Sequence, residues 1–214
     1  MKKVAFVPLK LNNERLPDKN TKKFDNGKSL VTYILDTLNT INDIDEKFVY
    51  CSQESVKEFL PNGITYLSRP ETLDLSSTKI NEVIDAFVNS VDADVYILTH
   101  ATAPFISAKT IQEGITKVVS GRYDSAFTVQ KLQEFLWNEN SPINYDLENI
   151  PRTQDLPPVY AETTGLYIFT KELWKNTGRR IGFKPYLIEI SKIEAVDINI
   201  PEDFFIANAL SSKL

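Results

Sequence analysis

A group of basic side chains follows the first apolar run of the chain, Val4–Val7. The basic residues are Lys10, Arg15, Lys19, Lys22 and Lys23. Asn12 and Asn13 stand among them, and asparagine tolerates the left-handed backbone conformation of tight loops. Such a loop can offer backbone N–H groups and ammonium charges to a polyphosphate. A solvated basic loop that binds nothing is the alternative interpretation.

The rarest residue types exclude several classes of site. The 214 residues include one cysteine, Cys51, and one histidine, His100. A single cysteine forms no intrachain disulfide, cysteine zinc site or iron–sulfur cluster, and a single histidine excludes a multi-histidine metal site. The 7 glycines lack the spacing of a dinucleotide fingerprint or a P-loop. Familiar ATPases, kinases and Rossmann dehydrogenases are therefore disfavoured.

The overall charge argues against a nucleic-acid partner. There are 24 Lys and Arg against 29 Asp and Glu, so the formal net charge is −5, whereas nucleic-acid-binding domains usually carry a basic excess. No stretch approaches the ~20 apolar residues of a membrane span. The apolar start is shorter than the ~7–15 residues of a secretory signal. With Cys51 unpaired, we expect a cytoplasmic protein without membrane contact.

Short apolar runs alternate with amphipathic segments of helical length. Strands are expected at Lys3–Pro8, Phe48–Cys51, Ile64–Leu67, Val95–Thr99, Ser125–Val129, Gly165–Thr170, Tyr186–Ile190 and Ala195–Ile198. Helices are expected at Ser29–Thr40, Glu54–Leu60, Thr78–Ser90, Ala108–Val119, Lys171–Thr177 and Pro201–Leu210. The alternation predicts a single α/β domain over residues 1–214, with a mixed, mainly parallel sheet of about seven strands between two helical layers. Ligands of such sheets bind beyond the carboxyl ends of the strands, where the basic loop falls.

Residues 130–162 interrupt this alternation with four prolines and with large aromatic side chains. The aromatic residues include Phe135, Trp137, Tyr145 and Tyr160. The segment is too apolar for a disordered linker, so we expect a protruding arm. An exposed apolar arm usually packs on a partner, and a homodimer is the simplest case.

Six short motifs along the chain resemble, in order, those of the acylneuraminate cytidylyltransferase family, which includes the CMP-sialic acid and CMP-pseudaminic acid synthetases. The motifs are Val4–Pro8 with the loop to Asn20, Gly27–Leu30, Ser68–Glu71, Leu98–Pro104, Arg152–Pro157 and Asp197–Phe204. The resemblance covers nearly the whole chain and implies a nucleotidyltransferase fold similar to that of GT-A glycosyltransferases. Members of the family join CTP to the anomeric hydroxyl of an acidic sugar and release pyrophosphate, with a divalent cation neutralising charge on the phosphates.

The resemblance also implies a role for residues of each motif. Lys10, Lys19 and Asp197 would be catalytic. Nucleotide contacts would come from Lys10, Asn12, Arg15, Lys19, Asn20, Arg69 and Thr78. Sugar contacts would come from His100, Thr102, Arg152, Gln154, Tyr160 and Glu162. Asp197 and Asn199 would bind Mg²⁺, a hard cation that prefers oxygen ligands.

Departures from the family pattern leave other functions open. Lys10 stands where the family usually has Arg, Glu14 stands where it often has Lys, and Asn199 replaces a second Asp. His100 also replaces a Gln that usually faces the sugar. A non-catalytic descendant that binds a nucleotide or sugar is therefore one alternative. A nucleotide-sugar glycosyltransferase is another, but its Asp-x-Asp motif should follow a strand, whereas Asp43–Asp45 and Asp92–Asp94 precede strands.

Overall fold

Seven strands form one sheet within residues 1–12 and 16–213, the part of the chain that the computed structural model describes. Their spatial order is β3-β2-β1-β4-β6-β5-β7. The strands are β1 (Lys3–Pro8), β2 (Glu46–Cys51), β3 (Thr65–Ser68), β4 (Val95–Thr99), β5 (Ser125–Leu132), β6 (Val159–Thr170) and β7 (Pro185–Glu189). β6 is antiparallel to both of its neighbours, and every other pairing is parallel. The mixed, mainly parallel sheet predicted from the sequence is confirmed.

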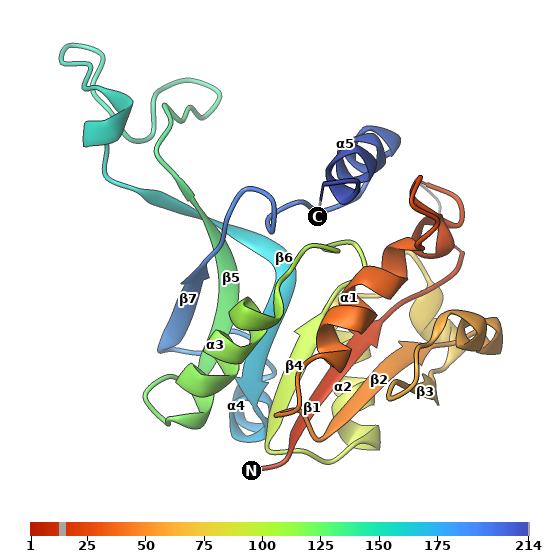
Figure 1. Cartoon of the computed structure of the whole chain (residues 1–214). Coiled ribbons are helices and arrows are strands. Elements are labelled where there is room, and N and C mark those ends of the chain that lie inside the picture. The colour runs from red at the N-terminus through yellow and green to blue at the C-terminus, as the bar shows by residue number, and fades with distance from the viewer. Residues whose placement is uncertain (13–15, 214) are drawn as a thin grey trace.

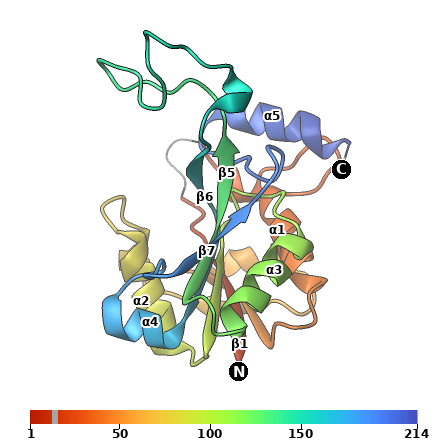
Figure 2. The same ribbon diagram turned by 90° about the vertical axis from the view of Figure 1, so that its left-hand side faces the viewer.

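Helices cover both faces of this sheet, so the domain has three layers (Figures 1 and 2). The helices are α1 (Leu30–Asn39), α2 (Ile80–Ser90), α3 (Ala108–Val119), α4 (Lys171–Thr177) and α5 (Pro201–Ser211), with short 3-10 turns η1 (Lys19–Thr21), η2 (Glu54–Phe59), η3 (Glu71–Asp74) and η4 (Thr153–Asp155). α1 and α3 lie on one face, and α2 and α4 lie on the other. Among the described helices, none has the length and apolar character needed to cross a membrane.

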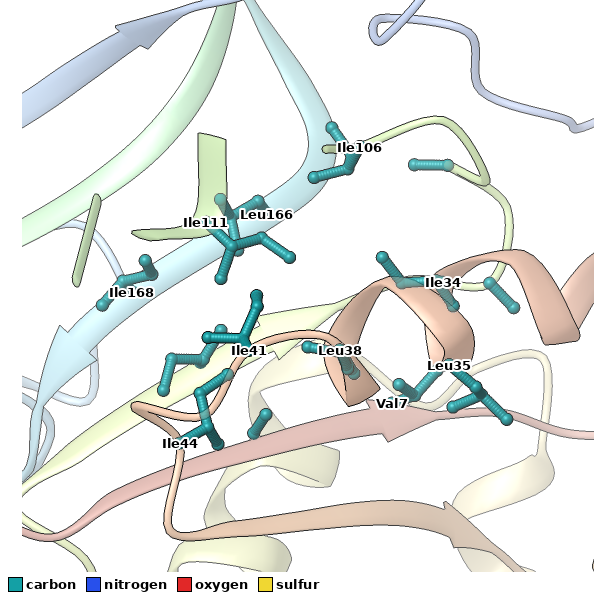
Figure 3. Packing of buried hydrophobic residues seen from close by; sticks show 14 of the residues in the cluster. Val7, Ile34, Leu35, Leu38, Ile41, Ile44, Ile106, Ile111, Leu166 and Ile168 are labelled. Carbon is teal, nitrogen blue, oxygen red and sulfur yellow. The ribbon is translucent and has the colours of Figure 1, made fainter. Parts of the chain in front are cut away.

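The apolar spacing of α1 explains how it packs on the sheet. Ile34, Leu35 and Leu38 fall on one side of the helix and are fully buried against β1, as Figure 3 shows around Val7. On the opposite face, the rings of Phe6 and Phe87 stack with centroids 4.0 Å apart. Apolar side chains therefore pack on both faces of the sheet, and this packing fixes the positions of the strand ends.

The segment before α5 differs from the prediction. The sequence predicts a strand over Ala195–Ile198, but the segment forms a turn and an irregular stretch. The Ile198 N–H donates to the Thr102 carbonyl oxygen across 2.8 Å, and a single bond of this kind does not make a ladder. Ile198 is buried with Phe24 and Phe204, so the segment crosses the carboxyl edge of the sheet and anchors α5 there.

The arm leaves the domain between β5 and β6, which run on together beyond the rest of the sheet (Figures 1 and 2). Residues 130–132 and 159–162, which the sequence placed in the arm, belong to these paired strands. At the tip, Trp137 Nε1 donates to the Tyr145 hydroxyl across 2.7 Å, and the Phe135 and Tyr145 rings lie 4.6 Å apart. Trp137 nevertheless remains 52% exposed, so the arm presents apolar surface.

Candidate active site

A cavity of about 240 Å³ lies at the carboxyl edge of the sheet. Four of the predicted site residues line it, namely Lys10, Arg69, Thr78 and His100. They come from the ends of β1 and β3, the approach to α2, and the end of β4, while α2 closes the apolar side with Ile80 and Val83. A larger hollow of about 660 Å³ between α1 and α3 is lined mainly by apolar surface and by none of the predicted residues. Of these two hollows, the smaller one is therefore the one that predicted site residues line.

Arg69 is held rigidly in this cavity by a buried ion pair. Its Nε and Nη2 donate to one carboxylate oxygen of Asp74, at 3.1 and 2.5 Å. The other carboxylate oxygen accepts from the Ser52 hydroxyl at 2.5 Å, and the Asp74 carbonyl accepts from Lys10 Nζ at 3.0 Å. Removing one partner of such a pair would leave a buried charge uncompensated. These bonds join the loop after β1 to η3 and pre-organise the cavity wall.

Hydrogen bonds within the basic loop after β1 hold its shape. Asp18 adopts a left-handed conformation with φ 53° and accepts bonds from the next turn, η1. Asn20 is buried, and its amide nitrogen donates to the Lys10 carbonyl across 2.8 Å. Asn20 therefore fixes the shape of the loop. Asn12 is exposed at the surface of the loop, and Arg15 lies outside the described residues.

His100 occupies the end of β4, where its main-chain N–H donates to the Gly165 carbonyl at 3.3 Å. Burial lowers the pKa of its imidazole to about 4, and the positive charges of Arg180 and Lys19 act in the same direction. The Asp197 carboxylate opposes the shift. At neutral pH His100 is therefore an uncharged ring that can exchange hydrogen bonds with a hydroxyl group.

One carboxylate oxygen of Asp197 has no hydrogen-bond partner among the described residues. Its Oδ2 accepts from the Thr164 hydroxyl at 3.1 Å and from Asn199 Nδ2 at 2.8 Å. Its Oδ1 is buried without a hydrogen bond in the described structure, and an unpaired buried oxygen of this kind suits a hard cation. The residues that the structure describes contain no cluster of three acidic, His or Cys side chains able to hold a metal. A cation here would therefore take further ligands from substrate and water.

An arginine that the sequence analysis did not single out lies next to these groups. Arg180 stacks on the Tyr167 ring, with its guanidinium carbon 3.7 Å from the centroid. The Tyr167 hydroxyl donates to the Glu162 carboxylate, and Arg180 Nη2 lies 3.7 Å from Glu162 Oε1. Burial, followed by the bond to Glu162, raises the pKa of Tyr167. Arg180 follows a helix, α4, whereas the candidate residues predicted from the sequence follow strands, so its position carried no signal.

The predicted sugar contacts divide into two groups. His100, Thr102 and Glu162 belong to the edge of the sheet just described. Tyr160 lies at the base of the arm and is 43% exposed. Arg152 and Gln154 lie at η4 on the arm itself, where Arg152 Nε donates to Asp155 at 2.8 Å. Within one chain, these two residues stand apart from the cavity.

The chain is similar in sequence to known cytidylyltransferases. A family model described as Cytidylyltransferase matches residues 4–188. N-acylneuraminate cytidylyltransferase A of Danio rerio is 25% identical over 213 residues, which cover 95% of this chain and 49% of that protein. The corresponding enzyme of Oncorhynchus mykiss is 22% identical, over 92% of this chain and 48% of that protein. The chain spans about half the length of these relatives.

Solved structures share the fold at lower sequence identity. CMP:2-keto-3-deoxy-manno-octonic acid synthetase complexed with CTP superposes with a TM-score of 0.74 at 14% identity, over 100% of this chain and 99% of that chain. 4-Diphosphocytidyl-2C-methyl-D-erythritol synthase from Anaerococcus prevotii gives a TM-score of 0.69 at 14% identity, over 99% and 96%. These likenesses establish the nucleotidyltransferase fold that the sequence predicted.

Proposed function

Because this chain belongs to the cytidylyltransferase family, whose model matches residues 4–188, we propose that it joins CTP to the anomeric hydroxyl of an acidic, nonulosonate-like sugar. The observation that carries the proposal is the convergence of two groups at one edge of the sheet. Lys10, Arg69 and His100 line the cavity. Lys19 donates to the carbonyl oxygen of Ile198, the residue that follows Asp197, across 2.8 Å. The cations that we propose for the triphosphate and the carboxylate that we propose for a metal therefore lie at the same edge of the sheet.

The proposed reaction is a displacement at the α-phosphorus of CTP. The anomeric oxygen forms a bond to that phosphorus, the bond to the β-phosphate bridging oxygen breaks, and pyrophosphate leaves with the electron pair. The hydroxyl proton is lost to water. Lys10 and Lys19 would neutralise charge that builds up on the phosphates, and such fixed positive charges are the main source of catalysis in phosphoryl transfer. Arg69 and Thr78 would hold the cytidine.

Mg²⁺ is the metal that the oxygen donors of this site fit. Asp197 would bind it through the buried Oδ1, with Asn199 as a neutral neighbour. Bound there, the cation would supply additional charge neutralisation for the phosphate oxygens. Asn199 donates its amide nitrogen to Asp197, so its first role toward the metal is to orient that carboxylate.

We also propose that the protein is a homodimer assembled through the arm. Trp137 and Phe135 are exposed there, and a partner would remove this apolar surface from water. Arg152 and Gln154 lie on the same arm, so their predicted contact with a sugar requires that the arm reach the site of a second copy. The other proposed partners are the two substrates, CTP and the acidic sugar. The cytoplasmic location expected from the sequence stays a prediction.

The two alternatives are weaker on specific grounds. A glycosyltransferase would need an Asp-x-Asp motif at the site. The side chains of Asp43 and Asp94 instead accept bonds from Lys3 Nζ and from the Lys2 N–H, each at 2.6 Å, near the amino end of β1. The non-catalytic descendant is disfavoured by the unpartnered Asp197 oxygen, because a protein that only binds nucleotide has no need to keep a buried carboxylate oxygen unpaired.

The proposal is tested by measuring pyrophosphate release from CTP with Mg²⁺ and a panel of 2-keto-3-deoxy sugar acids of eight and nine carbons. Matched reactions replace CTP by ATP or the acid by a neutral sugar. We expect release only with CTP and a sugar acid, together with a CMP-sugar identified by mass spectrometry. Binding of CTP without turnover on any acid would instead support the non-catalytic descendant.

A further inference from the structure

The guanidinium of Arg180 is held by ring stacking and by a long ion pair with Glu162, and its N–H groups donate no hydrogen bond within the described residues. It stacks on the Tyr167 ring at 3.7 Å, and its side chain is 21% exposed. Within residues 1–12 and 16–213, no acceptor takes a hydrogen bond from it, because its distance of 3.7 Å to Glu162 exceeds hydrogen-bond range. None of its nitrogens is both buried and unpartnered. Its N–H edge therefore faces accessible space.

This position adjoins the proposed site. Tyr167 pairs with Leu98 in the sheet register, two residues before His100. The charge of Arg180 acts on the His100 ring, as do those of Lys19 and Asp197. The guanidinium thus lies over β6 while the phosphate-binding lysines lie on the loop after β1. The site contains two separate positive centres.

A planar guanidinium stacked on an aromatic ring keeps its in-plane N–H groups for a second, flat partner. A carboxylate matches this fork and can accept two parallel hydrogen bonds. Glu162 neutralises Arg180 only in part, since it lies 3.7 Å away and also accepts from Tyr167. His100 is uncharged at neutral pH and does not compete for the anion.

We propose that Arg180 binds the carboxylate of the acceptor sugar and so selects acidic over neutral acceptors; this inference rests on the proposed function. A keto-acid sugar carries its carboxylate on the anomeric carbon, beside the hydroxyl that attacks CTP. The acceptor and the triphosphate are both anionic and must approach closely. A cation for each, on different elements, lowers the cost of bringing the two together.

Three variants separate this role from a structural one. Arg180→Met removes the charge and the fork, whereas Arg180→Lys keeps the charge without the fork. Arg179→Met is the matched control, because Arg179 is the adjacent, exposed arginine and lies over the Phe183 ring at 5.1 Å. Thermal melting of all three checks that they fold.

The readout is steady-state kinetics with CTP and the sugar acid that is the best substrate. In Arg180→Met we expect the acceptor KM to rise about 10- to 100-fold, the loss typical of charge-assisted hydrogen bonds. The KM for CTP in this variant should stay within about twofold of the wild-type value. The acceptor KM of Arg180→Lys should lie between those of the wild type and Arg180→Met, and that of Arg179→Met should equal the wild-type value. The wild-type preference for the free acid over its methyl ester should disappear in Arg180→Met.

An unchanged acceptor KM and an unchanged preference for the acid in a folded Arg180→Met variant would overturn the assignment of Arg180 while leaving the proposed function standing. A rise in the KM for CTP alone would also overturn it, because the arginine would then serve the triphosphate. If the wild type releases no pyrophosphate with any sugar acid, the proposed function fails and this inference fails with it.

Discussion

The side-chain amine of Lys19 donates a hydrogen bond to the carbonyl oxygen of Ile198 across 2.8 Å, although 179 residues separate the two in the sequence. This bond joins the basic loop after β1 to the segment that carries Asp197. The groups proposed to bind phosphate and metal are therefore built as one unit. Removing the Lys19 amine is therefore expected to disturb the segment that carries Asp197.

Replacing Lys19 by methionine should weaken CTP binding by about 10- to 100-fold, because one charge-assisted contact to the triphosphate is lost. Calorimetry measures the affinity directly. Lys23→Met removes the same charge from the exposed outer part of the loop and should change the affinity by less than about twofold. Equal affinities of the Lys19 variant and the wild type would remove this loop from the nucleotide site.

Asp197→Asn should abolish turnover while leaving the melting temperature nearly unchanged, because an amide oxygen can still accept from Thr164. Asn199→Asp should lower the Mg²⁺ concentration needed for the half-maximal rate, since a second carboxylate adds Coulomb attraction. Rates measured across a Mg²⁺ titration test both variants. Substantial activity in Asp197→Asn, or an unchanged metal dependence in Asn199→Asp, would assign this pair a structural role.

The sequence predicted best where local patterning and packing agree. Val95–Thr99 and Ala108–Val119 have the predicted bounds, because a continuous apolar run and a helical stripe each face the core directly. Ala195–Ile198 resembles a strand in composition, but the open edges of the sheet are β3 and β7, and the segment is buried instead by α5. Only tertiary contacts decide such a case.

The candidate site was predictable where it follows strands. Lys10, Arg69 and His100 each come just after a parallel strand, and the strand ends bring them to one cavity. Arg180 follows α4 and depends on a ring 13 positions earlier, in the antiparallel strand β6. Local sequence does not show that β6 pairs between β4 and β5. The stacking of Arg180 on Tyr167 depends on that pairing, so it could not be predicted either.

His100 should titrate with a pKa of about 4, below the ordinary value of 6.5. The unfolded chain then binds a proton between these values while the folded chain does not. The contribution of His100 to the free energy of unfolding is therefore fully present above about pH 6.5. It falls as the pH is lowered and levels off near pH 4, and the total fall is about 3 kcal/mol. His100 is the only histidine, so a tag-free sample gives one imidazole NMR signal to follow.

His100→Gln supplies the control for this titration. The difference in unfolding free energy between the wild type and the variant should be constant above pH 7 and should change between pH 6.5 and 4. An imidazole signal that titrates near pH 6.5 would contradict the uncharged, half-buried ring, and with it the role of His100 as a neutral hydrogen-bonding group.

Charging the arm should dissociate the proposed dimer. Trp137→Glu places a carboxylate on the exposed apolar tip, where burial against a partner would cost its desolvation. Sedimentation velocity at micromolar concentration should show a dimer for the wild type and a monomer for the variant. Glu139→Lys, on the same exposed turn, controls for a change of charge alone, and a monomeric wild type would refute the dimer.

Transfer of a cytidylyl group is tested by following the phosphorus atoms of CTP. Reactions with α-³²P-CTP and γ-³²P-CTP are run with Mg²⁺ and a sugar acid, and the products are separated. We expect the α label to pass to a CMP-sugar and the γ label to leave only as pyrophosphate. Release of the γ label as inorganic phosphate, or an α label that never joins the sugar, would contradict transfer of a cytidylyl group by this protein.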